Sequence, residues 1–224
     1  MIRDAKQSLL SPLLGAYVAW KVGRAFRGLW IDGVLPEDEQ GLLVYANHAS
    51  FWDGFVAHAL CRRFGRDGYA LMEERQLARY RFLRRLGAFS IRRGDATSAL
   101  ETLRHARRLL DRPRAAVFVF PQGRIAPRTS RPLEFERGVE VLARMTEGLS
   151  VPVAFRYAFF ESEYPDVLIR VGAPHRPESR ARMQERLNAL VSGLADVEQP
   201  RSFDPLLQGR RSVAERWDAV RGLA

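Results

Sequence analysis

Short apolar runs alternate along the chain with longer segments of helical periodicity. Residues 42–46 are apolar and β-branched at their centre, which is typical of a buried strand, and residues 115–120 form the clearest run of this kind. The alternation predicts an α/β fold with a mixed, mainly parallel sheet covered by helices. Further strands are expected at 69–72, 88–91, 151–157 and 167–171, and helices at 54–63, 73–86, 95–110 and 180–194. Asp95 is expected to cap the helix at 95–110, with Leu100 toward the core. The last stretch, 201–224, carries Trp217 and is expected to fold back as a terminal helix.

Residues 1–31 are interpreted as an N-terminal membrane-associating amphipathic helix or helix pair, and residues 32–224 as the α/β domain. The uncharged stretch from Leu9 to Trp20 is shorter than the ~20 residues that span a bilayer. Its pattern predicts a helix lying in the membrane interface, or one that packs its apolar stripe on the protein. The stripe comprises Leu10, Leu13, Leu14, Tyr17 and Trp20, and its basic flanks comprise Arg3, Lys6, Lys21, Arg24 and Arg27.

The net charge of the chain limits the classes of molecule that it is expected to bind. The net charge is +10, and nearly all basic residues are Arg, with Lys only at Lys6 and Lys21. This excess reflects genome composition or favours an anionic partner such as a lipid surface, a phosphorylated cofactor or nucleic acid. The pattern of a nucleic-acid-reading strand or helix is missing from the sequence, so nucleic acid is not predicted. The single Cys61 excludes an internal disulfide framework, and the sequence has no metal-ligand spacing.

One candidate chemical pair follows the run at 42–46. His48 lies in a polar corner between the predicted strand and helix, and Asp53 lies in the first helical turn. A carboxylate on one ring nitrogen of a histidine fixes its tautomer and stabilises the imidazolium, which lets the other nitrogen remove a proton near neutral pH. The alternative is a structural His beside a helix-capping Asp.

Four sequence blocks carry a resemblance that covers about residues 42–172. The stretch Asn-His-Ala-Ser-Phe-Trp-Asp at 47–53 resembles the first signature of the glycerolipid acyltransferases, the family of bacterial 1-acyl-glycerol-3-phosphate acyltransferases. Gly-Ala-Phe-Ser-Ile-Arg-Arg at 87–93 resembles the second block, Phe-Pro-Gln-Gly at 120–123 the third, and Val-Pro-Val-Ala at 151–154 the fourth.

The resemblance implies transfer of a fatty acyl group from acyl-CoA or acyl carrier protein to a lipid hydroxyl, most simply that of 1-acylglycerol-3-phosphate. It implies His48 as general base and Asp53 as its orienting carboxylate, without a metal or cofactor beyond the thioester co-substrate. Backbone N–H groups near Gly123 are candidate donors to the oxyanion. The cytoplasmic face of the cell membrane is the expected location, through peripheral or monotopic attachment. The expected substrate-binding residues are Arg93, Gln122, Gly123, Arg124 and Arg128.

The third block departs from the family pattern of Glu, Gly, Thr and Arg. Gln122 replaces the Glu, Arg124 the Thr and Ile125 the Arg. A contact that needs a carboxylate is therefore lost, because an amide carries no charge. The departure leaves open an acceptor without glycerol phosphate, such as a glycolipid or another lipid alcohol. A silent basic membrane-binding protein and a hydrolase that uses water also remain open.

Overall fold

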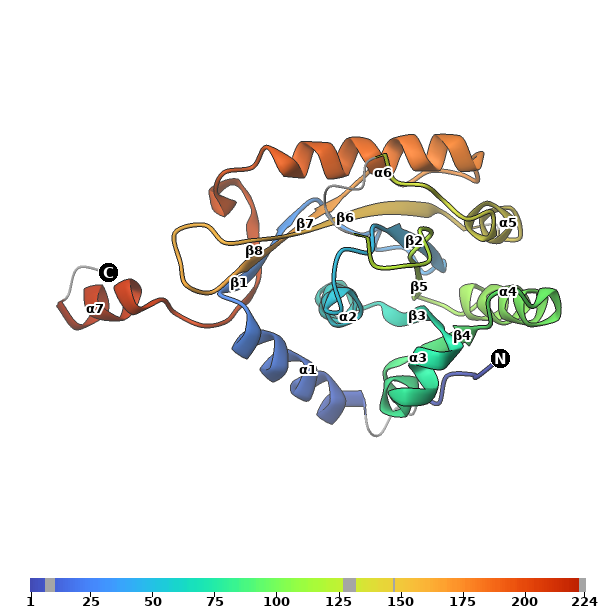
Figure 1. Cartoon of the computed structure of the whole chain (residues 1–224), viewed down its shortest axis with the longest axis horizontal. Helices are drawn as coiled ribbons and strands as arrows, with labels where there is room; N and C mark the ends of the chain where they lie inside the picture. Colours follow the sequence, from blue (N-terminus) through green and yellow to red (C-terminus); the bar gives the residue numbers. More distant parts are fainter. Residues whose placement is uncertain (7–10, 127–131, 147, 222–224) are drawn as a thin grey trace.

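The chain folds around one mixed sheet (Figure 1). A computed structural model describes residues 1–6, 11–126, 132–146 and 148–221. Its strands are β1 (Gly28–Asp32), β2 (Leu42–Ala46), β3 (Asp67–Glu73), β4 (Ala88–Ile91), β5 (Ala115–Val119), β6 (Ser150–Ala158), β7 (Asp166–Val171) and β8 (Asp204–Gln208). Within the described residues, these strands form an 8-stranded sheet in the order β4-β3-β5-β2-β6-β7-β1-β8. The β6–β7 and β1–β8 pairs are antiparallel and the others are parallel, which confirms the predicted fold class.

Helices cover both faces of the sheet. They are α1 (Ser11–Ala25), α2 (Asp53–Arg63), α3 (Glu74–Arg79), α4 (Ala96–Leu110), α5 (Gly138–Arg144), α6 (Arg180–Ala195) and α7 (Val213–Arg221), with 3-10 segments η1 (Arg81–Leu86) and η2 (Pro200–Ser202). In Figure 1, α6 lies along one face, and α1, α2 and α3 lie on the opposite side. Leu43 and Tyr45 of β2 belong to the core under α4, α5 and α6, whereas Leu42 and Val44 belong to the core under α1 and α2. Because both faces are buried, the central strands are apolar without alternation.

Several predicted elements are confirmed to the residue or nearly so. Residues 42–46 and 88–91 form β2 and β4 as predicted. Helix α4 follows Asp95, whose carboxylate accepts a hydrogen bond from the Ser98 N–H at 2.9 Å. This cap satisfies one of the backbone N–H groups that the first turn of a helix leaves without a partner.

Two strands at the sheet edge were not predicted. The boundary expected at residue 31 falls inside β1, which pairs in parallel with β7 and antiparallel with β8. Strand β8 occupies part of the region expected to form only a terminal helix. Neither strand is a continuous apolar run: β1 begins with Gly28 and ends with Asp32, and β8 begins with Asp204 and Pro205 and ends with Gln208, so the pattern that identifies β2 and β5 is missing from both.

Three details of the helix predictions are wrong. The helix expected over 73–86 is interrupted at Tyr80, whose φ of −112° and ψ of 57° are not helical, and residues 81–86 form the 3-10 segment η1 instead. Leu100 is 47% exposed, since α4 packs through Thr102, Ala106 and Leu109 instead. The terminal helix α7 does not fold back but lies at one side of the molecule (Figure 1), with Trp217 59% exposed.

Candidate active site

The loop after β2 carries the candidate base and is tied to the neighbouring strand. The side-chain amide of Asn47 donates to the Phe155 carbonyl at 2.9 Å, and its Oδ1 accepts from the Phe155 N–H at 2.7 Å. The carboxyl ends of β2 and β5 meet at this edge because the two strands are parallel. The loop therefore leaves the sheet from a fixed position at the edge where α/β proteins place their sites.

Asp53 is the centre of the hydrogen-bond network in this loop. It begins α2, its side chain is 0% exposed, and its Oδ2 lies 2.7 Å from Nδ1 of His48. The same oxygen accepts from the backbone N–H groups of Ala49 at 2.8 Å and Ser50 at 3.0 Å. The structure thus brings His48 and Asp53 together. When Nδ1–H donates to the carboxylate, Nε2 has a free lone pair and can accept a proton.

Tyr157, at the end of β6, also holds Asp53 and was not predicted from the sequence. Its hydroxyl donates to Oδ1 of Asp53 at 2.7 Å, while its ring lies 5.7 Å from that of Phe26. Burial, followed by the negative charge of Asp53, raises the pKa of the Tyr157 phenol well above its ordinary value. The phenol therefore remains protonated near neutral pH and donates to the carboxylate.

The side chain of Gln122 contacts the backbone of the candidate base, His48. Its Oε1 accepts a hydrogen bond from the His48 backbone N–H at 2.8 Å, so the side chain connects the loop after β5 to the loop after β2. The ring of Phe120 stacks on the imidazole of His48 with the centroids 4.5 Å apart. These two contacts position His48 from the neighbouring loop.

Gly123 is required by its backbone conformation and by a close neighbour. Its φ is +66°, and a Cβ atom there would lie 2.3 Å from Nη2 of Arg93. Its N–H donates to the Phe120 carbonyl at 2.9 Å and closes a turn. The expectation that N–H groups near Gly123 stabilise an oxyanion is therefore weakened for Gly123 itself, because its hydrogen is already used.

The two candidate phosphate-binding arginines lie at the same opening. Arg93 and Arg124 are exposed and line a cavity together with His48. Arg92, next in sequence to Arg93, instead pairs with Glu74 at 2.6 Å. Within the described part of the chain, the salt bridges include none from Arg93 or Arg124 to a carboxylate. Arg128, also predicted to bind substrate, lies outside the described residues.

The cavity beside His48 has a volume of about 560 Å³ and runs between α2, β3, β4 and the α3–η1 segment. Such a volume is typical of small-molecule sites. Apolar side chains from separate elements form most of its inner wall; among them are Phe55, Leu71, Leu83, Leu86 and Ile91. In the described residues, no group of three His, Cys, Asp or Glu side chains is placed to hold a metal ion.

One comparison with known proteins is positive. The family model named Acyltransferase matches residues 32–156, more than half of the chain. The matched stretch includes His48, Asp53, Arg93 and Gln122 but ends one residue before Tyr157. The curated proteins include no match to this chain.

Proposed function

The chain belongs to the Acyltransferase family, and we propose that it moves a fatty acyl group from acyl-CoA or acyl carrier protein to 1-acylglycerol-3-phosphate, giving phosphatidic acid. Family membership supports acyl transfer to a lipid hydroxyl; the donor, the acceptor and the mechanism are the proposal. The observation that carries it is the His48–Asp53 contact of 2.7 Å at the opening of an apolar cavity of about 560 Å³. The proposal needs no metal or cofactor beyond the thioester co-substrate.

In the proposed mechanism, Nε2 of His48 removes the proton of the acceptor hydroxyl. The oxygen attacks the thioester carbonyl and forms a new C–O bond, and the C–S bond then breaks. The leaving thiolate takes the proton back from His48. The buried carboxylate of Asp53 keeps the imidazole in the required tautomer and stabilises its charged form between the two proton transfers.

The charge at the opening favours an acceptor with a phosphate group. Arg93 and Arg124 are exposed beside His48, and planar guanidinium groups bind phosphate through two parallel hydrogen bonds. Gln122 takes no part in binding the acceptor in this proposal, because its Oε1 accepts from the His48 N–H. The missing family Glu at this position is therefore compatible with a phosphorylated acceptor.

A lipid alcohol without phosphate is the second candidate acceptor. Ile125 is 52% exposed at the cavity opening, at a position where the resembling family carries Arg. An apolar side chain there removes one cation from the phosphate site and offers contact to an uncharged acceptor. This single difference is the reason to test both acceptor classes.

The acceptor is tested by product analysis with purified protein. Palmitoyl-CoA is offered with lysophosphatidic acid and then with neutral lipid alcohols, and thiol release and lipid products are measured for wild type, Arg93→Gln and Arg92→Gln. We expect Arg93→Gln to raise KM for lysophosphatidic acid about tenfold, the loss of one charge-assisted contact. Arg92→Gln is the matched control, since Arg92 is engaged with Glu74.

Each other result identifies an alternative. Turnover with neutral alcohols alone would mean a changed acceptor. Release of free palmitate without any acceptor would mean a hydrolase. No turnover with either acyl-CoA or acyl carrier protein donors would favour a silent membrane-binding protein.

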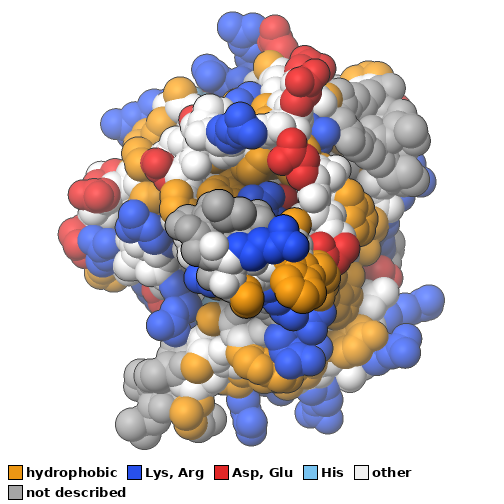
Figure 2. Space-filling view, turned by 90° about the vertical axis from the view of Figure 1, so that its left-hand side faces the viewer, with side chains coloured by type: hydrophobic (Ala, Val, Ile, Leu, Met, Phe, Trp, Pro, Cys, Tyr) orange, Lys and Arg blue, Asp and Glu red, His pale blue; other side chains and the backbone are white. Residues whose placement is uncertain are grey.

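The exposed apolar side chains of helix α1 support the peripheral membrane attachment that we propose; the cytoplasmic face is part of the same proposal. The helix packs on the body through Val18 and Val22, while Leu13, Tyr17 and Trp20 are 70%, 40% and 58% exposed. Leu10 lies outside the described residues. Basic and hydrophobic side chains are interspersed over the face of the molecule in Figure 2. No helix of the described chain is long and apolar enough to cross a bilayer.

Liposome flotation tests this attachment. Deleting the first 30 residues would also remove the backbone contact between Ile2 and Ser90 and most of β1. The sharper variant replaces Leu13, Tyr17 and Trp20 with Ser and is compared with Val141→Ser on α5, which is 42% exposed. We expect binding to anionic liposomes to fall only in the α1 variant. Unchanged flotation of that variant would contradict the attachment.

A further inference from the structure

Helix α7 begins at a point that the rest of the protein fixes. The Ser212 hydroxyl accepts a hydrogen bond from the Glu215 N–H at 3.0 Å, and the Glu215 carboxylate accepts one from the Ser212 N–H at 2.7 Å. This reciprocal pair is a capping box, which satisfies backbone N–H groups at the start of a helix. The same carboxylate accepts from Arg27 at 3.2 Å, and Glu163 accepts from the Val213 N–H at 3.0 Å. The first turn of α7 therefore has a defined place on the body of the protein.

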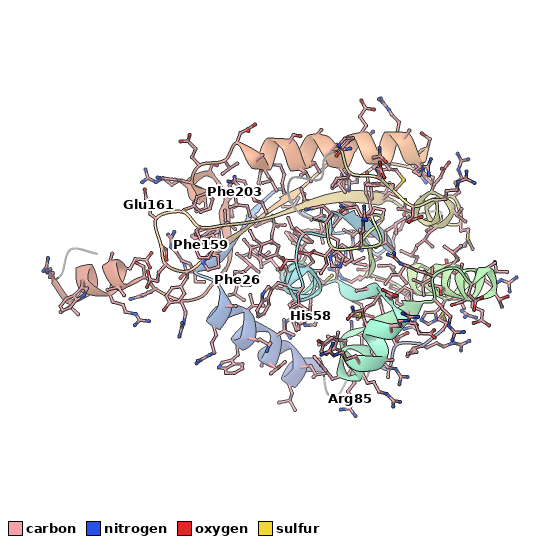
Figure 3. The ribbon with its side chains drawn as sticks, in the orientation of Figure 1. Phe26, His58, Arg85, Phe159, Glu161 and Phe203 are labelled. Carbon is pink, nitrogen blue, oxygen red and sulfur yellow. The ribbon has the colours of Figure 1, made fainter. Side chains whose placement is uncertain are left out.

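The chain that enters α7 is attached to the end of α1. The backbone N–H groups of Gly209 and Arg210 donate to the carbonyls of Arg27 and Phe26 at 2.8 and 3.0 Å. The approach requires a glycine, because a Cβ atom at Gly209 would collide with the Phe26 carbonyl. Figure 3 shows Phe26 at the end of α1, with α7 beyond it at the side of the molecule. Helices α1 and α7 therefore lie at the same end of the protein.

One face of α7 is apolar and exposed. Val213, Trp217 and Val220 are 55%, 59% and 78% exposed, and we call these three residues the α7 stripe. Successive residues of an α-helix are about 100° apart around its axis, so the α7 stripe lies within an arc of about 60°. Arg216 and Arg221 are also exposed, and each lies about 40° outside one edge of this arc. The apolar stripe thus has a cationic side chain on each side.

This pattern of charge indicates the partner. A helix with an exposed apolar stripe, an aromatic ring on the stripe and basic residues beside it fits the interface of a membrane, where the headgroups supply negative charge. Glu215, which would be repelled by such a surface, lies on the opposite side of the helix and is paired with Arg27. Figure 2 views this end of the molecule and shows Lys and Arg side chains beside hydrophobic ones. A second copy of the chain fits less well, because two copies that each carry a net charge of +10 repel one another.

We infer that α7 is a second interfacial helix, which binds an anionic membrane surface through the α7 stripe, Arg216 and Arg221. This inference extends the proposed attachment through α1 and adds a separate contact to it. Because the chain entering α7 is hydrogen-bonded to the end of α1, binding of one helix brings the other to the same surface, and the second contact raises the overall affinity. Two contacts also fix how the protein is oriented on the bilayer.

A fluorescent label at position 217 reports this contact alone. Trp217→Cys is labelled with the environment-sensitive nitrobenzoxadiazole group, and Val141→Cys on α5, 42% exposed in wild type, is the matched control. The native Cys61 is 2% exposed, so the label reacts with the introduced thiol. Vesicles of phosphatidylglycerol and phosphatidylcholine should shift the emission at 217 to the blue and leave that at 141 unchanged. Vesicles of phosphatidylcholine alone should produce a smaller shift.

Liposome flotation measures how strong the contact is. Replacing the α7 stripe with Ser, or Arg216 and Arg221 with Gln, should lower the partition coefficient for anionic vesicles about tenfold. All five side chains are exposed, so both variants should melt at the wild-type Tm. Val141→Ser is again the control and should bind as wild type does.

The results distinguish α7 from α1. A blue shift at 217 that persists when Leu13, Tyr17 and Trp20 are replaced with Ser would support the contact of α7, even if α1 does not bind. Flotation of the protein without a shift at 217 would overturn the inference and leave the attachment through α1 standing. A shift that grows with protein concentration in the absence of vesicles, together with a dimer mass in sedimentation, would also overturn it, because the occupant would then be a second copy. None of these measurements requires acyl transfer.

Discussion

Replacing Tyr157 with Phe removes the hydroxyl that donates to Oδ1 of Asp53 at 2.7 Å and keeps the ring beside Phe26. The Asp53 side chain is 0% exposed, so water cannot take the place of the lost donor. A hydrogen bond to a buried charged group contributes about 1.5–3 kcal/mol. For a chain of this length, we expect Tm to fall by roughly 3–12 °C.

The same substitution should lower the rate of acyl transfer. With one oxygen free, Asp53 orients His48 less firmly, and we expect kcat to fall about tenfold, equivalent to ~1.4 kcal/mol of barrier, with little change in KM for the donor. Tyr45→Phe is the matched control. Its hydroxyl is also buried and lies 3.0 Å from Nε2 of His175, so this variant should lose stability but retain kcat.

Thermal melts and steady-state kinetics of the two variants decide the matter. A Tyr157→Phe enzyme with wild-type Tm and kcat would refute the reasoning, because Oδ1 of Asp53 would then need no donor. An equal loss of kcat in Tyr45→Phe would also refute it, since the effect would follow from general destabilisation.

Three further predictions concern neighbouring groups. Gln122→Leu removes the acceptor of the backbone N–H of the candidate base and should lower kcat about tenfold, while Gln122→Glu retains an acceptor oxygen; equal rates of both variants would contradict this role. Gly123→Ala should raise KM for a phosphorylated acceptor, because the new Cβ meets the Arg93 guanidinium, whereas Gly138→Ala, with open space at its Cβ, should leave KM unchanged. The pKa of His58 is about 4 in the folded protein and near 6.5 when unfolded, so protonation favours unfolding and the free energy of unfolding should fall from pH 6.5 toward pH 4. Urea titrations should show a smaller decrease over this pH range for His58→Leu than for wild type. The same decrease in both proteins would refute this prediction.

The central sheet could be predicted because its signals are local. In β2 and β5 each residue is buried on one face or the other, so the runs are apolar over their whole length. The cap of α4 depends on a single side chain and the turn that follows it. Strands β1 and β8, at one end of the sheet, have no comparable local signal, because β1 pairs with β7 and β8 pairs with β1 only in the folded chain.

The candidate site was predictable only in part, for the same reason. His48 and Asp53 are five residues apart, so their contact follows from the turn between β2 and α2. Tyr157 reaches Asp53 across 104 residues of sequence, and Gln122 reaches the His48 N–H across 74. These contacts depend on which strands are neighbours, and a pattern of polar and apolar residues does not specify that order. The roles assigned to His48, Asp53, Arg93 and Arg124 remain predictions.

Thiol release by wild type, His48→Ala and Asp53→Asn tests the proposed chemistry most directly. The three proteins are compared at equal concentration, first confirmed as folded, with palmitoyl-CoA or palmitoyl-acyl carrier protein and the acceptor that wild type uses. We predict that His48→Ala falls to the background rate without enzyme, and that Asp53→Asn loses at least about a hundredfold in kcat, because the amide cannot stabilise the imidazolium. Acyl transfer by His48→Ala at a rate near that of wild type would contradict the account.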